Sequence, residues 1–273
     1  MTKPVTRYLT RPDGTLAYDD QGRGPLVLLV PGLGDLRSEY RFLTPHLVAA
    51  GYRVVTVDLR GHGESSVDWP DYTPSAVGDD LVALLRELDA GPAAVVGTSF
   101  AAAAAVWAAA EVPELVSSLV LVGPFVRDQE MNIVQTAMLN ALMYGPWKVR
   151  AWTWYYQTLY PSQQPGDFAA YVARLRANLA EPGRFRAVQA MIASKRAEVE
   201  ARFGEVRAPT LVVMGDKDPD FKSPEGEARA VATALSGEVA MIPGAGHYPH
   251  AEMPDVTAPL LLDFLKMSLH RAA

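Results

Sequence analysis

Short, wholly apolar runs alternate with amphipathic stretches along most of this chain, and this alternation constrains the fold more than any other feature. Residues 26–30 form the uninterrupted apolar run LVLLV, which is typical of a strand buried on both faces of a sheet. Residues 74–89 instead place apolar side chains at the spacing of one helix face. Such units connect parallel strands through right-handed crossovers. The predicted fold class is therefore α/β, with a doubly wound, mostly parallel sheet.

The expected elements can be followed along the chain. Residues 5–10 and 15–19 are predicted to pair as a hairpin that turns at Asp13 and Gly14. Further strands are expected at 26–30, 52–57, 93–97, 115–122, 210–215 and 239–243. Helices are expected at 38–50, 74–89, 99–110, 225–235 and 255–270.

This alternation is interrupted between Gly123 and Pro209, where helical patterns continue without a convincing strand. We therefore predict that residues 1–123 and 207–273 form an α/β core. Residues 124–206 are predicted to form a helical cap, inserted over the edge of the sheet. No internal repeat or flexible linker divides the chain further.

Aromatic residues are concentrated in one part of the predicted cap. Between Tyr144 and Tyr160 they are far denser than the chain average of 9%. Such a cluster can form the cap's own small core, which is the favoured interpretation, or the wall of an apolar substrate pocket. The candidate substrate-binding side chains within it are Trp147, Trp152, Trp154 and Tyr155.

The predicted cap is also weakly basic, although the whole chain carries a net charge of −6. Residues 124–206 contain 10 Lys or Arg against 7 Asp or Glu. Four arginines of this segment could attract an anionic ester, but we favour a solvated helix face for them. They are Arg174, Arg176, Arg184 and Arg186.

Composition excludes several kinds of site and partner. The chain has no cysteine, which rules out disulfides, thiolate nucleophiles and cysteine-ligated metal centres. Its net charge of −6 gives no general attraction to nucleic acid. The apolar runs are too short to span a bilayer and no secretory signal follows Met1, so a cytoplasmic protein is expected. We expect a small-molecule substrate with an apolar part, no cofactor and no metal.

The most specific segment is residues 95–101, VVGTSFA, where a buried strand turns directly into a helix at Ser99. A tight turn of this kind strains the central residue and holds its side chain clear of the backbone. Gly97 and Ala101, two residues to either side, are small enough to let strand and helix approach. Ser99 is therefore a candidate nucleophile, the alternative being that its side chain merely caps the helix.

A second glycine-rich turn follows the strand at 26–30. Its sequence is PGLGD, residues 31–35. The Leu33 amide in this turn and the Phe100 amide after Ser99 could donate two hydrogen bonds to a developing oxyanion. The alternative is a tight turn without a role in chemistry.

Carboxylates and histidines gather after the strands predicted at 210–215 and 239–243. Because α/β sheets place their sites at the carboxyl ends of the strands, we expect these side chains near Ser99. His247 is favoured as the base over the other histidine there, which lies nearer to the last helix. The residues concerned are Asp216, Asp218, Asp220, His247 and His250.

Together these segments resemble the α/β-hydrolase fold family over nearly the whole chain. Residues 58–65, DLRGHGES, resemble the family's turn after its fourth strand, and residues 246–254 resemble its G-H-x-x-x-x-E-x-P ending. The order serine, acid, histidine is also the family's order. Pro31 departs from the histidine with which many members begin the first turn, and Ala101 stands where glycine is usual. The resemblance implies a cap-bearing, esterase-like member with a serine nucleophile.

The resemblance also assigns roles to the candidate residues. Ser99 would be the nucleophile, and His247 would take its proton and later return it to the leaving group. Asp218 would orient the imidazole, because the family's pattern puts the acid at the third position after the strand. Asp216 is the main alternative for this acid and Asp220 the weaker one.

The implied activity is hydrolysis of a carboxylic ester or lactone through an acyl-enzyme on Ser99. Two alternatives use the same three residues: hydrolysis of a carbon–carbon bond in a diketone, and perhydrolysis with peroxide. A third is a ligand receptor with little turnover. Haloalkane dehalogenases and epoxide hydrolases resemble the fold but carry aspartate where Ser99 stands, so they are set aside.

Overall fold

The computed structural model describes residues 5–128 and 133–272. In this part of the chain, eight strands form one sheet in the order β1-β2-β4-β3-β5-β6-β7-β8. The two pairs β1–β2 and β2–β4 are antiparallel, and all other neighbours are parallel. The strands are β1 (Arg7–Arg11), β2 (Gly14–Gly22), β3 (Leu26–Val30), β4 (Arg53–Val57), β5 (Ala93–Thr98), β6 (Val116–Val122), β7 (Thr210–Gly215) and β8 (Glu238–Ile242). The predicted α/β fold class is confirmed.

Helices cover both faces of the sheet, because side chains alternate along each strand. Leu28 and Val30 of β3 pack toward one core with α2 (Pro74–Leu88), α3 (Phe100–Glu111) and α9 (Pro224–Ala234). Val27 and Leu29 pack toward the other core with α1 (Leu43–Ala49) and α11 (Pro254–Ala272). The two pairs are fully buried, which explains why this strand is apolar throughout.

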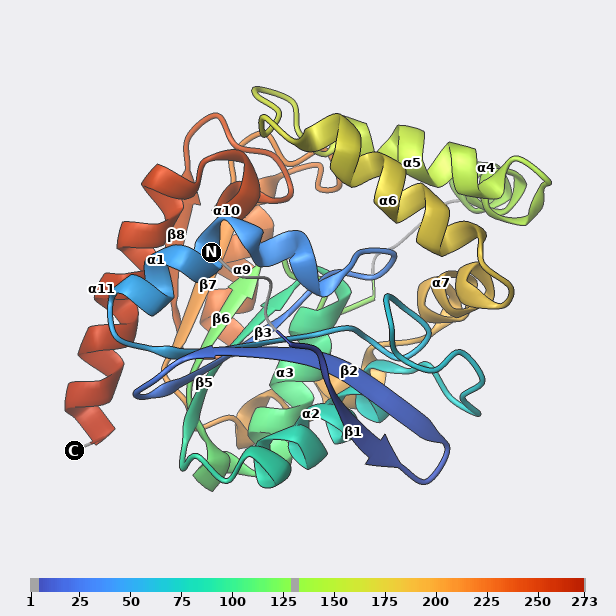
Figure 1. Ribbon diagram of the computed structural model, residues 1–273. Helices are drawn as coiled ribbons and strands as arrows, with labels where there is room; N and C mark the ends of the chain where they lie inside the picture. Colours follow the sequence, from blue (N-terminus) through green and yellow to red (C-terminus); the bar gives the residue numbers. More distant parts are fainter. Residues whose placement is uncertain (1–4, 129–132, 273) are drawn as a thin grey trace.

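Helices α4 to α8 come from the segment predicted as a cap, and the described residues of 124–206 contain no strand. Figure 1 shows α4, α5 and α6 lying together over one end of the sheet, away from α1 and α11. The division of the chain into a core and a cap at 124 and 206 stays a prediction. The helices are α4 (Ile133–Tyr144), α5 (Lys148–Thr158), α6 (Phe168–Ala180), α7 (Arg184–Ala193) and α8 (Ala197–Glu200).

The remaining elements are short. Three of them are 3-10 turns, and the fourth is a single helical turn that leads into α11. They are η1 (Arg37–Arg41), η2 (Pro113–Leu115), η3 (Phe203–Glu205) and α10 (Pro249–Glu252). None of the helices described here combines the length and the apolar character needed to cross a membrane.

Two predicted elements differ in detail. The hairpin turns at Pro12 and Asp13 rather than at Asp13 and Gly14, since Arg11 already pairs with Gly14. Proline favours the first central position of a turn, and Gly14 is needed for space, because a Cβ there would lie 2.9 Å from Ser66.

The single helix expected at 38–50 is in fact two pieces, η1 and α1, with the break at Phe42. Pro45 explains the break. Its ring would collide with the carbonyl of Arg41 in a continuous α-helix.

Leu29→Ala removes a fully buried side chain from β3 and is expected to lower the free energy of unfolding by about 2–5 kcal/mol. The same change at Leu260, which is 41% exposed on α11, is expected to cost less than about 1 kcal/mol. Urea denaturation followed by circular dichroism measures both. Equal losses in the two variants would contradict the assignment of Leu29 to the core.

Candidate active site

The chain reverses sharply between β5 and α3, and Ser99 occupies the reversal. Its φ of 56° and ψ of −120° lie outside the regions that serine prefers. Gly97 makes the turn possible, because a Cβ there would lie 2.6 Å from the carbonyl oxygen of Ala101. The Ser99 side chain makes no capping hydrogen bond to α3. Its hydroxyl is therefore not used as a helix cap.

Hydrogen bonds on both sides of the serine hold this conformation. The Ser99 amide donates to the carbonyl of Val122 at 2.8 Å, and the Phe125 amide donates to the Ser99 carbonyl at 3.2 Å. Both partners belong to the end of β6 and the segment after it. The neighbouring strand thus fixes the serine in its strained conformation.

The glycine-rich turn after β3 lies against the same site. The Gly32 amide donates to Glu39 Oε2 at 2.8 Å, and the Gly34 amide donates to His62 Nε2 at 2.9 Å. Between them, the Leu33 amide makes no hydrogen bond to another described residue, and neither does the Phe100 amide at the start of α3. Both N–H groups are available to a ligand, and their assignment to an oxyanion hole stays a prediction.

His62 is held neutral, which its role as an acceptor requires. Burial lowers its pKa to about 4. Its Nε2 accepts from Gly34, so the proton resides on Nδ1, which lies 2.9 Å from the carbonyl of Arg60. This histidine supports the turn and takes no proton from a substrate.

A buried acidic cluster lies beneath the turn. Burial raises the pKa of Glu39 to about 7, and burial together with the charge of Glu39 raises that of Asp35 to about 7. Asp35 accepts hydrogen bonds from Tyr156 at 2.8 Å and from Tyr171. Tyr156 lies in α5 and Tyr171 lies in α6. Their hydrogen bonds to Asp35 therefore tie these two helices to the turn.

His250 lies beside Glu39 in the buried acidic cluster and does not line the cavity described below. Its Nε2 lies 2.8 Å from Glu39 Oε1, and its ring stacks on Tyr40. Burial lowers its pKa to about 3, so its ring stays neutral. His250 does not line the cavity that Ser99 and His247 share, so it is not placed to act as the base.

His247 pairs with one of the three aspartates that the sequence offers. Its Nδ1 lies 2.7 Å from Asp218 Oδ2 and 3.7 Å from Asp220 Oδ2. Asp216 is exposed and accepts a hydrogen bond from the Gly244 amide instead. Asp220 accepts from the hydroxyl of Tyr155. Asp218 is thus the aspartate in hydrogen-bond contact with the imidazole.

The charges around His247 favour its protonated form. Burial opposes protonation, but the charges of Asp218 and Asp220 and the hydrogen bond to Asp218 outweigh it and raise the pKa of His247 to about 9. Burial raises the pKa of Asp220 in turn. A histidine of this kind is a strong base when it is neutral.

The ligand atoms of Asp218, Asp220 and His247 lie within 4.8 Å of one another, a spacing that can hold a metal ion. The closest pair, His247 Nδ1 and Asp218 Oδ2, is however separated by only 2.7 Å, a hydrogen-bond distance. Two ligands of one zinc ion, each about 2.0–2.2 Å from it, normally stand farther apart. The arrangement fits a shared proton better than a metal.

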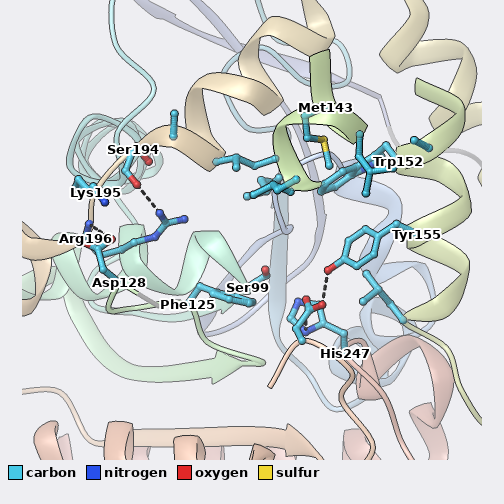
Figure 2. A pocket seen from close by; sticks show the side chains of 18 of the residues that line it. Ser99, Phe125, Asp128, Met143, Trp152, Tyr155, Ser194, Lys195, Arg196 and His247 are labelled. Atoms are coloured by element: carbon cyan, nitrogen blue, oxygen red, sulfur yellow. Dashed lines mark hydrogen bonds and ion pairs between the residues drawn. The ribbon is translucent and has the colours of Figure 1, made fainter. Parts of the chain in front are cut away.

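Ser99 and His247 open into one cavity of about 340 Å³. Leu33, Phe125 and Met143 contribute to its apolar wall (Figure 2). This volume is at the lower end of the range for small-molecule sites. The nucleophile candidate, the base candidate and one oxyanion-hole residue therefore meet in a site suited to a small ligand.

The four aromatic candidates fall into two groups. Trp152 and Tyr155 line the cavity, and Trp152 also donates a hydrogen bond to the Gly34 carbonyl at 3.2 Å. Trp147 and Trp154 do not line it and are 53% and 64% exposed. The prediction is wrong for these two: Trp154 lies on the exposed side of α5, and Trp147 precedes that helix and donates from Nε1 to the carbonyl of Ala141. The favoured interpretation of the cluster as a small core is confirmed for Tyr156.

The basic residues of the cavity were missed by the sequence interpretation. Arg127, Lys195 and Arg196 line it, whereas the four arginines singled out earlier do not. Arg184 and Arg186, for example, pair with Glu181 and Asp68. The sequence offered one signal for these residues. Lys195 and Arg196 lie just after the end of α7, where side chains can turn inward.

Comparison with known proteins gives the relatives of this chain. Residues 27–260 match the model of the alpha/beta hydrolase family. The 2-(acetamidomethylene)succinate hydrolase of Mesorhizobium japonicum is 28% identical over 264 residues, which cover 92% of this chain and 91% of the relative. The 2-hydroxy-6-oxo-6-phenylhexa-2,4-dienoate hydrolase of Burkholderia cepacia is 26% identical over 265 residues, or 90% of each chain.

Solved structures share the fold. A bromoperoxidase from Bacillus anthracis superposes with a TM-score of 0.83 at 21% identity, covering 97% of this chain and 100% of the other. At this identity the likeness concerns the fold alone.

Folding raises the pKa of His247 from 6.5 to about 9, so the protonated ring stabilises the fold. This contribution is complete below pH 6.5 and is lost as the pH rises through about 9. Asp218→Asn should lower the midpoint of the His247 titration, measured by NMR, and should reduce the loss of stability between pH 6.5 and 9.5. The control is Asp255→Asn, an exposed carboxylate beside His46. An unchanged midpoint in Asp218→Asn would contradict the pairing.

Proposed function

Because the chain belongs to the alpha/beta hydrolase family, we propose that it is a serine hydrolase that cleaves a carboxylic ester or lactone through an acyl-enzyme on Ser99. The observation that carries the proposal is the position of Ser99 and His247 in one cavity, with Asp218 bonded to the far side of the imidazole. A serine hydroxyl is a weak nucleophile and needs an adjacent base of this kind.

In the proposed reaction, Ser99 Oγ attacks the carbonyl carbon while His247 accepts the hydroxyl proton on Nε2. Its Nδ1 faces Asp218 at 2.7 Å, so the carboxylate stabilises the imidazolium that forms. The free amides of Leu33 and Phe100 donate to the oxyanion. His247 then protonates the leaving alcohol, and water enters by the reverse of these steps to release the acid.

The same groups can act on other bonds next to a carbonyl group. One relative is named a dienoate hydrolase and another a succinate-derivative hydrolase, and each is less than 30% identical to this chain. Because the name of the first of these relatives describes a keto acid, we retain hydrolysis of a diketone carbon–carbon bond as the second candidate. A panel of aryl esters, lactones and diketones separates it from ester hydrolysis, and a receptor would show binding with little turnover of any of them.

Ser99→Ala should lower kcat/KM for 4-nitrophenyl acetate by about 10³-fold or more, because no acyl-enzyme can form. The matched control is Ser75→Ala on α2, which does not line the cavity. A fluorophosphonate probe should label the wild type at Ser99. An unchanged rate in Ser99→Ala would overturn the assignment of the nucleophile.

The pH dependence of kcat/KM tests the base. His247 must be neutral to accept a proton, and its pKa is about 9, so kcat/KM should rise about tenfold per pH unit below that pH and level off above it. In Asp218→Asn the plateau should be lower by about 10³- to 10⁴-fold, and the midpoint should move to lower pH. A profile that is flat from pH 6 to 9 would exclude His247 as the base.

A further inference from the structure

The cavity next to Ser99 is chemically divided. Figure 2 shows Trp152 and Tyr155 on one side and Lys195 and Arg196 at the opposite end, and Arg127 also lines the cavity. Figure 2 shows the Arg196 guanidinium extending from this end toward the middle of the cavity, in the direction of Ser99. A cation in this position is unusual in a cavity whose wall is largely apolar, because burying a charge is costly without a partner.

Arg196 has unused donors among the described residues. A guanidinium carries five N–H groups. Nη1 donates to the carbonyl of Ser194, and Nε is buried without a hydrogen-bond partner. The guanidinium carbon lies 5.5 Å from the centre of the Phe100 ring, and Phe100 directly follows Ser99. The cation thus lines the same cavity as Ser99, and its own contacts leave a donor without a partner.

The neighbouring charges do not neutralise Arg196 directly. The Asp128 carboxylate accepts a hydrogen bond from the main-chain amide of Arg196 at 3.1 Å, and no ion pair joins it to the guanidinium in the described residues. Arg127 makes two hydrogen bonds to Glu227, at 2.9 and 2.7 Å. Burial lowers the pKa of Arg196, with Asp128 acting in the opposite direction, and an arginine remains charged under these conditions.

We propose that Arg196 binds a carboxylate group of the substrate, so that the substrate is a small ester or lactone carrying a free carboxylate remote from its reacting carbonyl. This inference rests on the proposed function and names its substrate class. Nη2 and the remaining Nη1 hydrogen can pair with the two oxygens of one carboxylate, a bidentate geometry that a guanidinium matches well. A dianionic phosphate is less suited, because it would approach the Asp128 carboxylate at the same end.

The chemistry at Ser99 is unchanged for such a substrate. With the monoethyl ester of a dicarboxylic acid, the ester C–O bond breaks and a bond forms between Ser99 Oγ and the carbonyl carbon. Ethanol leaves with the proton carried by His247. Water then supplies the hydroxyl of the second carboxyl group and the proton that returns to the serine. The products are the dicarboxylic acid and ethanol, and no other reactant is needed.

The test compares two esters of equal chain length, monoethyl glutarate and ethyl pentanoate, in a pH-stat. The wild type should prefer the anionic ester, and Arg196→Gln should lower the ratio of the two kcat/KM values by about 10- to 100-fold. Arg196→Lys should retain part of the preference. Arg186→Gln removes an exposed arginine of α7 that lies outside the cavity, and it should leave the ratio unchanged. A ratio that stays within about threefold in Arg196→Gln would overturn the proposal.

Binding gives a second readout that does not depend on turnover. Glutarate titrated into Ser99→Ala by calorimetry should bind about 10- to 100-fold more weakly when Arg196→Gln is added. Equal binding in the two proteins would overturn the carboxylate site, even if esters are hydrolysed. If Ser99→Ala hydrolyses esters like the wild type, the proposed function fails, and the glutarate titration still decides whether Arg196 binds a carboxylate.

Discussion

The contact between β5 and α3 allows no side chain beyond hydrogen at Gly97, and the arrangement of the site depends on this contact. The helix runs through the middle of the core, and its alanines at 101–105 are fully buried. Alanine combines the highest helix propensity with the smallest side chain that still packs, so α3 can lie directly against the strands. Because strand and helix are so close, the chain between them must reverse within one residue.

That residue is Ser99, and its backbone conformation costs about 1–3 kcal/mol. The cost is tolerated because the surrounding backbone fixes the turn through the hydrogen bonds to Val122 and from Phe125. The same reversal leaves the Phe100 amide at the start of α3 without an acceptor in the part of the chain that the structure describes. One packing constraint therefore accounts for both the position of Ser99 at the cavity and one of the free donors beside it.

Sequence reasoning succeeded where a local pattern determines the outcome. The apolar run of β3 and the VVGTSFA turn are set by neighbouring residues, and both occur as expected. The choice among Asp216, Asp218 and Asp220 came from the family's pattern, because all three follow the same strand; only coordinates show which carboxylate faces His247. Local signals also failed at Trp147 and Trp154, since density of aromatic residues says nothing about the side of a helix on which each one lies.

The least predictable features are those in which charge and burial are decided by partners far away in the chain. Asp35 ends a glycine-rich turn, and nothing near it in the sequence indicates that it is buried against Tyr156 and Tyr171, more than 100 residues later. Arginines of the 124–206 segment look alike in the sequence, but Arg184 and Arg186 find acidic partners whereas Arg196 enters the cavity. The net charge of this segment does not distinguish the paired arginines from the one that lines the cavity. What distinguishes Arg196 is that its Nε is buried without a hydrogen-bond partner and that no ion pair joins its guanidinium among the described residues. In a cavity beside a nucleophile, an anionic part of the ligand can balance this charge.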